Sequence, residues 1–299
     1  MMPESMRVFL AACRHILCIL MFVLVVIGPS ASAFDNSGEG LLIGVEPEHN
    51  IFEQIERYRI LAEYLSKELG INVRLTVMSR YGELLKRFKS RRLDGAFLSS
   101  YTAAMAFKQL NLEPVAMAVN LKDNAFSQGY LFTRKDSGIT AAKEMQGKSI
   151  VFVDPATTEG YLFPLVWLRQ NGVKDKERYF SRFSFSGSHA SAIFAVLDGK
   201  ADIGCAKSTV YNRQITKDPT IGAELRIIAE SAAVPETTLC LKKDIPGEVK
   251  QKLLAILEKM TSTERGRSVL HNIELLRFVK AGDSDFDGIA KMIEIVEKP

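Results

Sequence analysis

The sequence lacks the short motifs that carry much of enzyme chemistry. Its 299 residues contain neither G-x-G-x-x-G nor G-x-x-x-x-G-K-[ST], so a role in nucleotide chemistry has no support. No G-x-S-x-G elbow presents a nucleophilic serine. The four histidines are scattered and show no metal-ligand spacing (His15, His49, His189 and His271). We therefore expect no catalytic residue, no metal site and no cofactor.

Charge of one sign and long apolar runs are also scarce. Lys and Arg number 39 and Asp and Glu number 35, and the net charge of +4 is too small for a nucleic-acid-binding protein of this length. Apolar residues make up 47% and charged residues 25%, which excludes a disordered chain and a membrane protein with many spans. The length suffices for one large domain or two modest ones.

The one long apolar run is N-terminal and predicts an export signal over residues 1–33. Arg7 and Arg14 precede an apolar run at 16–27, and a small-x-small cleavage site ends at Ala33. This run is shorter than the roughly 20 residues that span a bilayer as a helix. We expect cleavage after Ala33, with an uncleaved membrane anchor as the alternative. The mature chain then keeps Cys205 and Cys240, which are predicted either to form a disulfide or to be two buried thiols.

The mature chain alternates strands and helices. Apolar spacing predicts a strand at 41–45, a helix at 51–69 closed by a glycine, and a strand at 71–77. The alternation continues to the C-terminus and favours mostly parallel sheets covered by helices. Residues 92–96 and 200–204 form a weak internal echo, each with an aspartate at a helix-to-strand turn. Together with the length, this pattern predicts two similar α/β lobes.

Polar residues, mostly hydroxyls, follow four of the predicted strands. In open α/β sheets, ligands bind beyond the carboxyl ends of the strands, where helices begin. The residues at these helix starts include Ser99, Ser100, Thr157, Thr158 and His189. Backbone N–H groups at a helix start are unpaired and favour an anion, so the four starts together indicate an oxyanion site. Ser and Thr are also ordinary helix N-caps, and at any single helix this second interpretation competes with the first.

A series of segments occurs in an order typical of one family. The segments are residues 81–84, 93–98 with Tyr101, 129–139, 146–150, 154–164, 187–189 and 196–202. In this order and spacing they resemble the PhnD-like periplasmic substrate-binding proteins of phosphate, phosphite and phosphonate ABC transporters. The resemblance covers about residues 41–296, which is nearly the whole mature chain.

The resemblance implies a type II periplasmic binding protein fold, with two α/β lobes and a ligand cleft between them. It divides the chain into a signal peptide (1–33), lobe 1 (34–127), lobe 2 (128–235), and a return crossing with C-terminal helices that complete the lobes (236–299). Carried over position by position, the family's ligand contacts fall on Tyr81, Tyr130, Thr157, Thr158, Glu159 and His189. Ser99 and Ser100 join this predicted ligand-binding set because they open a helix.

Two features depart from the family pattern. Glu159 stands where the family has the third hydroxyl of its phosphonate-binding turn, and a carboxylate beside an oxyanion costs energy unless it is protonated, paired or turned away. Lys207 is interpreted as its partner, as a ligand contact or as a solvated lysine. In some family members acids hold the amine of aminoalkyl phosphonates. By a loose alignment those positions fall near Thr209 and Thr237, which argues against such a cationic ligand.

The resemblance implies an exported, periplasmic solute-binding protein that is not an enzyme. We expect a monomer that captures a small oxyanion of the phosphate, phosphite or phosphonate class and delivers it to an ABC permease, without nucleic acid. Three alternatives stay open. The chain is otherwise a periplasmic component that reports its ligand to a membrane sensor, a binder of a different small solute, or an enzyme on the same fold.

Overall fold

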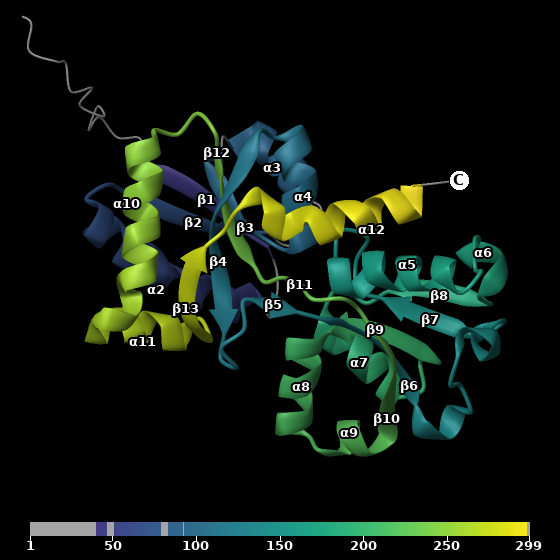
Figure 1. The fold of residues 1–299 in the computed structure, drawn as a ribbon. Helices are drawn as coiled ribbons and strands as arrows, with labels where there is room; N and C mark the ends of the chain where they lie inside the picture. Colours follow the sequence, from purple (N-terminus) through teal and green to yellow (C-terminus); the bar gives the residue numbers. More distant parts are fainter. Residues whose placement is uncertain (1–39, 47–50, 79–82, 92, 298–299) are drawn as a thin grey trace, which may run out of the picture. The chain divides into compact units, whose positions relative to one another are not determined.

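The computed structural model describes residues 40–46, 51–78, 83–91 and 93–297. The predicted export signal and Tyr81 lie outside these residues. Two large mixed sheets, each covered by helices on both faces, account for most of the described chain (Figure 1). We call the first sheet with its helices lobe 1 and the second sheet with its helices lobe 2.

Lobe 1 is built on a sheet in the order β13-β4-β12-β3-β1-β2. Its strands are β1 (Leu41–Val45), β2 (Val73–Val77), β3 (Gly95–Leu98), β4 (Leu112–Asn120), β12 (Thr238–Lys242) and β13 (Leu275–Lys280). Its helices are α2 (Ile51–Leu69), α3 (Leu84–Arg91), α4 (Ser100–Gln109), α10 (Gly247–Glu258), α11 (Glu264–Asn272) and the short turn η4 (Lys259–Ser262). Apolar side chains of α2, α10 and α11 fill one face of the sheet, and those of α3 and α4 fill the other.

Lobe 2 is built on a sheet in the order β10-β6-β9-β7-β8. Its strands are β6 (Gly129–Arg134), β7 (Ser149–Phe152), β8 (Arg182–Phe185), β9 (Ile203–Lys207) and β10 (Leu225–Glu230). Its helical segments are η1 (Lys135–Ser137), η2 (Ala142–Met145), the π-helical turn η3 (Thr158–Leu162), α5 (Phe163–Gln170), α6 (Lys176–Tyr179), α7 (His189–Leu197), α8 (Ser208–Lys217) and α9 (Thr220–Glu224). Apolar residues of α7, α8 and α9 cover one face, and those of α5 cover the other.

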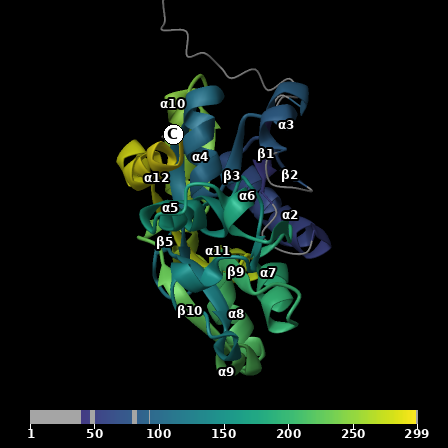
Figure 2. The same ribbon diagram turned by 90° about the vertical axis from the view of Figure 1, so that its right-hand side faces the viewer.

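Two short strands join the lobes. β5 (Phe126–Ser127) leads from lobe 1 into lobe 2, β11 (Val234–Pro235) leads back, and the two pair antiparallel. After the turn η5 (Asp283–Phe286), the last helix α12 (Asp287–Glu297) packs against α4 of lobe 1 and α5 of lobe 2, as both views show (Figures 1 and 2). The segments between the lobes are therefore a two-strand crossing and one C-terminal helix.

The prediction of mostly parallel sheets is wrong, because both sheets are mixed. β1 runs parallel to β2 and β3, but β12 runs antiparallel to β3 and β4. In lobe 2, β6 runs antiparallel to both β9 and β10. The strand that enters a lobe through the crossing runs against its neighbours. Alternating strands and helices in a sequence carry no information on that direction.

The two segments of the internal echo form equivalent hydrogen bonds, one in each lobe. In lobe 1 the Asp94 carboxylate accepts a 2.8 Å hydrogen bond from the backbone N–H of Leu42 in β1. In lobe 2 the Asp202 carboxylate accepts a 2.8 Å bond from the backbone N–H of Ser149 in β7. Each aspartate thus fastens the turn before a short central strand to the first parallel strand of its own lobe.

Of the two alternatives for the cysteines, the buried thiols are found, since Cys205 and Cys240 are both free and buried.

Candidate functional site

The start of helix α4 in lobe 1 is occupied by a carboxylate of the chain itself. Glu46 is buried, and its Oε2 accepts hydrogen bonds from the Ser99 N–H at 2.7 Å and from the Thr102 hydroxyl at 2.9 Å. The Ser99 hydroxyl in turn lies 2.6 Å from that of Thr102. Glu46 therefore accepts the hydrogen bonds at a helix start where we expected the donors to bind an external oxyanion.

Thr158 joins the two lobes at the same helix start. Its Oγ1 lies 2.7 Å from the Ser100 hydroxyl and accepts a 2.9 Å hydrogen bond from the Tyr101 N–H. Ser100 and Thr158 are both buried. The structure thus brings together two predicted site residues that are far apart in the chain, and it joins them to each other.

Thr157 and Glu159 flank Thr158 but are engaged elsewhere. The Thr157 hydroxyl donates to the Asp154 carbonyl at 2.7 Å, within its own turn. The Glu159 carboxylate is buried and accepts a 3.0 Å hydrogen bond from the Ser127 hydroxyl on the crossing strand β5. Burial raises the pKa of Glu159, the nearby Lys207 opposes this shift, and the net direction is upward. Glu159 therefore points at the crossing between the lobes.

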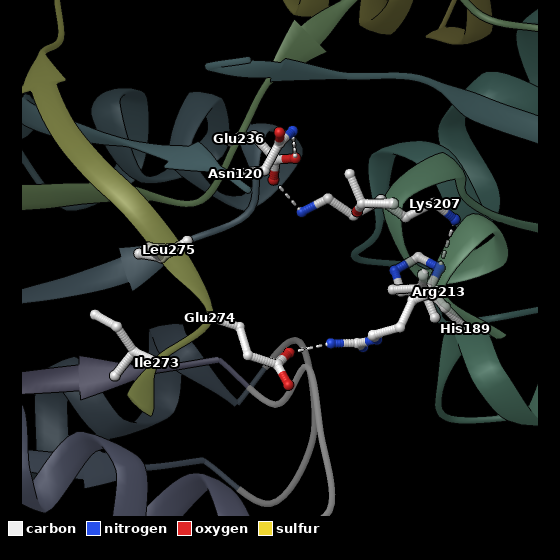
Figure 3. Close-up of a pocket in the computed structure, with 10 residues that line it drawn as sticks. Asn120, His189, Lys207, Arg213, Glu236, Ile273, Glu274 and Leu275 are labelled. Atoms are coloured by element: carbon white, nitrogen blue, oxygen red, sulfur yellow. Dashed lines mark hydrogen bonds and ion pairs between the residues drawn. The ribbon is translucent and has the colours of Figure 1, made fainter. Parts of the chain in front are cut away.

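A cavity of about 90 Å³ has walls from both lobes (Figure 3). Its lining residues are Asn120, His189, Lys207, Thr209, Val210, Arg213, Glu236, Ile273, Glu274 and Leu275. The cationic side chains come from β9 and α8 of lobe 2. The carboxylates come from the end of the crossing and from the start of β13, so the two walls carry opposite charge.

Lys207 and Glu236 form a buried ion pair across this cavity. The Lys207 Nζ lies 2.5 Å from Glu236 Oε2, and the two side chains are 9% and 7% exposed. The other oxygen of Glu236 accepts a 3.2 Å hydrogen bond from the Asn120 amide. The interpretation of Lys207 as a solvated lysine is wrong, because the end of β9 carries its side chain inward between the lobes (Figure 3).

A second ion pair crosses the cavity nearer to α8. Arg213 of α8 pairs with the Glu274 carboxylate. Arg57 of α2 pairs with the same carboxylate, with its Nη2 3.0 Å from Glu274 Oε1. Glu274 directly precedes β13 and has a φ of 56°, a left-handed conformation that is uncommon for a glutamate. This backbone turn accompanies a carboxylate that pairs with an arginine of each lobe, and Figure 3 shows its contact with Arg213.

Of the predicted site residues that the structure describes, His189 lines the cavity. It is the first residue of α7 and is 5% exposed. Its Nδ1 accepts a 3.1 Å hydrogen bond from the backbone N–H of Lys207, so the imidazole and the lysine are held together. The preceding Ser188 caps the helix through the N–H of Ser191. Tyr130 instead packs edge-on against Tyr211, with ring centroids 5.6 Å apart.

Sequence reasoning missed most of the charged lining of the cavity. No sequence motif marked Asn120, Arg213 or Glu274 as a site residue, and α8, which carries Arg213, was not predicted. Glu236 could have been found from the sequence, because it directly precedes Thr237, one of the two uncharged positions to which the loose alignment pointed. The cavity therefore does contain a carboxylate near that position, and the argument against a cationic group in the ligand loses its basis.

This architecture is that of the type II periplasmic binding proteins. The structure of PhnD1 from Prochlorococcus marinus in complex with methylphosphonate is similar with a TM-score of 0.75 at 18% identity, covering 87% of this chain and 98% of that one. A binding protein component of an ABC phosphonate transporter from Pseudomonas aeruginosa has a TM-score of 0.74 at 20% identity, with 85% of each chain covered. At such identities the likeness establishes the fold.

The sequence identifies the family. Residues 43–286 match the family described as "ABC transporter, phosphonate, periplasmic substrate-binding protein", and the chain belongs to it. The phosphate-import protein PhnD of Mycolicibacterium smegmatis is 22% identical over 287 residues, with 89% of both chains covered. The family is one of transport proteins that bind solutes in the periplasm. Within the part of the chain that the structure describes, no helix has both the length and the apolar character needed to cross a membrane.

Proposed function

We propose that this chain captures a small oxyanion of the phosphate, phosphite or phosphonate class in the cavity between its lobes and passes it to an ABC permease. The observation that carries the proposal is the lobe 2 wall, where Lys207, Arg213 and His189 face one cavity. A buried ammonium and a guanidinium are strong partners for an oxyanion, because hydrogen bonds to charged groups in a desolvated site are stronger than neutral ones.

The start of helix α8 adds to this wall. Thr209 and Val210 lie in its first turn and line the cavity. Backbone N–H groups in the first turn of a helix have no partner within the helix and favour an anion. The ligand in this proposal is therefore held by lobe 2 through two cationic side chains and a helix start. We assign His189 its predicted ligand contact in this proposal, and this contact stays a prediction together with those of Tyr81, Ser99, Ser100, Tyr130, Thr157, Thr158 and Glu159.

The lobe 1 carboxylates act as internal counter-ions in this proposal. Glu236 and Glu274 pair with Lys207 and Arg213 across the cavity. An oxyanion that enters competes with these carboxylates for the same cations. We further propose that the lobes extend over residues 34–127 and 128–235, with 236–299 completing both, and that the protein is exported by residues 1–33, binds as a monomer and turns nothing over.

The proposal is tested by measuring binding to the purified protein. Isothermal titration with phosphate, phosphite and methylphosphonate should give saturable binding of at least one of them, with amino acids as negative controls. The same ligand should raise the melting temperature in proportion to the logarithm of its concentration, because it binds the folded state alone. The absence of saturable binding of all three oxyanions at millimolar concentration would overturn the proposal.

A further inference from the structure

Two carboxylates and one ammonium group share the space at the end of β9. Lys207 pairs with Glu236 at 2.5 Å. Glu159 is close enough to both that Lys207 lowers its pKa and Glu236 raises it, against a larger upward effect of burial. All three side chains are nearly inaccessible to solvent. An oxyanion that meets Lys207 therefore also meets two carboxyl groups of the protein.

Glu236 is placed to accept a hydrogen bond from a ligand. Among the described residues, Lys207 pairs with its Oε2 and the Asn120 amide donates a hydrogen bond to its Oε1. A carboxylate offers about four acceptor positions, so lone pairs are left for a donor that enters the cavity. An oxyanion that carries a proton can donate to them. A fully deprotonated dianion presents only oxygen lone pairs to a carboxylate, and such like-charge contacts are unfavourable.

We propose that the cavity selects the protonated, singly charged form of a phosphorus oxyanion over a fully deprotonated dianion, and that Glu236 and Glu159 set this selectivity through Lys207. This inference rests on the proposed function. Glu236 acts by direct contact with the ligand proton. Glu159 acts as a positioning residue, because its carboxyl group interacts electrostatically with Lys207 and is held by the hydrogen bond that it accepts from Ser127 on the crossing strand.

The other charged groups around the cavity leave this assignment intact. Arg213 pairs with Glu274 at the far end of the cavity, and Glu274 also pairs with Arg57. His189 uses its Nδ1 as the acceptor for the Lys207 N–H, so adding a proton there would break that hydrogen bond. A dependence of binding on pH is therefore attributed to the ligand and to Glu159.

Titration calorimetry with inorganic phosphate and with sulfate from about pH 5.5 to about pH 8 tests the inference. Phosphate passes from monoanion to dianion in this range, and sulfate stays a dianion throughout. We expect the phosphate affinity to fall in step with the monoanion fraction as the pH rises. Protonation of Glu159 acts in the same direction. Sulfate should bind at least about tenfold more weakly than phosphate at the acidic end.

Variants separate the contributions. Glu236→Gln should flatten the pH profile and strengthen sulfate binding by about tenfold or more, and Glu159→Gln should do the same to a smaller extent. Glu113→Gln is the matched control, because Glu113 pairs with Lys250 in lobe 1 outside the cavity and should leave the profile unchanged. The profile of the parent protein tests the inference even where a variant folds poorly.

Two results would overturn the inference while the proposed function stands. One is phosphate binding that is independent of pH, with sulfate bound equally well by the parent protein. The other is a pH profile that is lost in His189→Asn but kept in Glu236→Gln and Glu159→Gln. Absence of binding of any oxyanion would instead overturn the proposed function itself.

Discussion

The two walls of the cavity differ in charge and in how the chain builds them. The lobe 2 wall takes Lys207 from the last residue of β9 and Arg213 from the helix that follows at once, so its cations are neighbours in sequence. The lobe 1 wall takes Glu236 from the end of the crossing and Glu274 from the turn before β13, nearly forty positions apart. The cationic wall is thus a local product of one strand and one helix, whereas the acidic wall is assembled by the tertiary fold.

The helix starts of the two lobes differ in the same way. Helix α7 of lobe 2 is capped by its neighbour Ser188, as a helix start usually is. At the start of helix α4 in lobe 1, the backbone N–H groups donate instead to Glu46, which follows β1, and to Thr158 of the opposite lobe. The difference shows why a hydroxyl at a helix start is a poor indicator of a ligand contact, since the partner that takes its donors can come from any part of the fold.

The largest effect is expected when the buried pair across the cavity is broken. Lys207→Met leaves Glu236 buried without its cation, and such a change typically lowers the free energy of unfolding by about 3–5 kcal/mol. It should also abolish phosphate binding. Urea unfolding and calorimetry measure both. Lys250→Met, which breaks a more exposed Lys–Glu pair, should cost about 1 kcal/mol or less and leave binding intact. Equal losses of stability in the two variants would contradict the role of burial.

An intermediate effect is expected at the hydrogen bonds of Thr158 between the lobes. Thr158→Ala removes the acceptor of the Tyr101 N–H and the partner of the buried Ser100 hydroxyl, which should lower the free energy of unfolding by about 1–3 kcal/mol. Thr158→Ser keeps the oxygen and should retain most of the stability. The comparison of the two variants by thermal unfolding isolates the hydroxyl. If alanine and serine behaved alike, the contact between the lobes would carry little energy.

The smallest effect is expected from Glu159, and its sign depends on pH. Its pKa in the folded protein is raised, chiefly by burial, above the ordinary value of 4.5. The folded state therefore holds the proton more tightly than the unfolded state, and stability falls as the pH rises through the interval between the two pKa values. Glu159→Gln should remove this dependence and stabilise the protein near neutral pH, and thermal unfolding of the variant and the parent measures both effects.

Glu144 provides the opposite sign as a control. Its carboxylate accepts hydrogen bonds from the backbone and side chain of Thr140 and from the backbone of Ala141, and these lower its pKa. The stability it contributes is present at neutral pH and is lost as the pH falls through its folded pKa. Between about pH 3 and pH 8, the differences in melting temperature between each glutamine variant and the parent should change with pH in opposite directions, rising with pH for Glu159→Gln and falling for Glu144→Gln. A parent-like pH profile in Glu159→Gln would show that this carboxyl does not govern the trend.

The sequence predicted the elements well where apolar spacing controls them. The strand at 41–45 and the helix at 51–69, ended by Gly70 with a φ of 79°, are found as predicted. Of the eight predicted ligand contacts, Tyr81 lies outside the described residues and His189 lines the cavity. Ser100 and Thr158 meet each other, and Ser99, Tyr130, Thr157 and Glu159 contact the protein itself. A sequence shows which side chains offer donors, but which partners satisfy them depends on elements that are distant in the chain.

The sequence by itself determined the family, the two α/β lobes and the repeated aspartate turn, because each depends on residues that are close in the chain. The tertiary structure decided the direction of the strands and the charge of the lobe 1 wall. Strand direction depends on where the chain re-enters a sheet through β5 and β11. The charge of the wall depends on the packing that brings Glu236 and Glu274 opposite Lys207 and Arg213. Pairing of buried charges is a property of three-dimensional neighbours, since the desolvation that makes an ion pair matter arises when the lobes pack together.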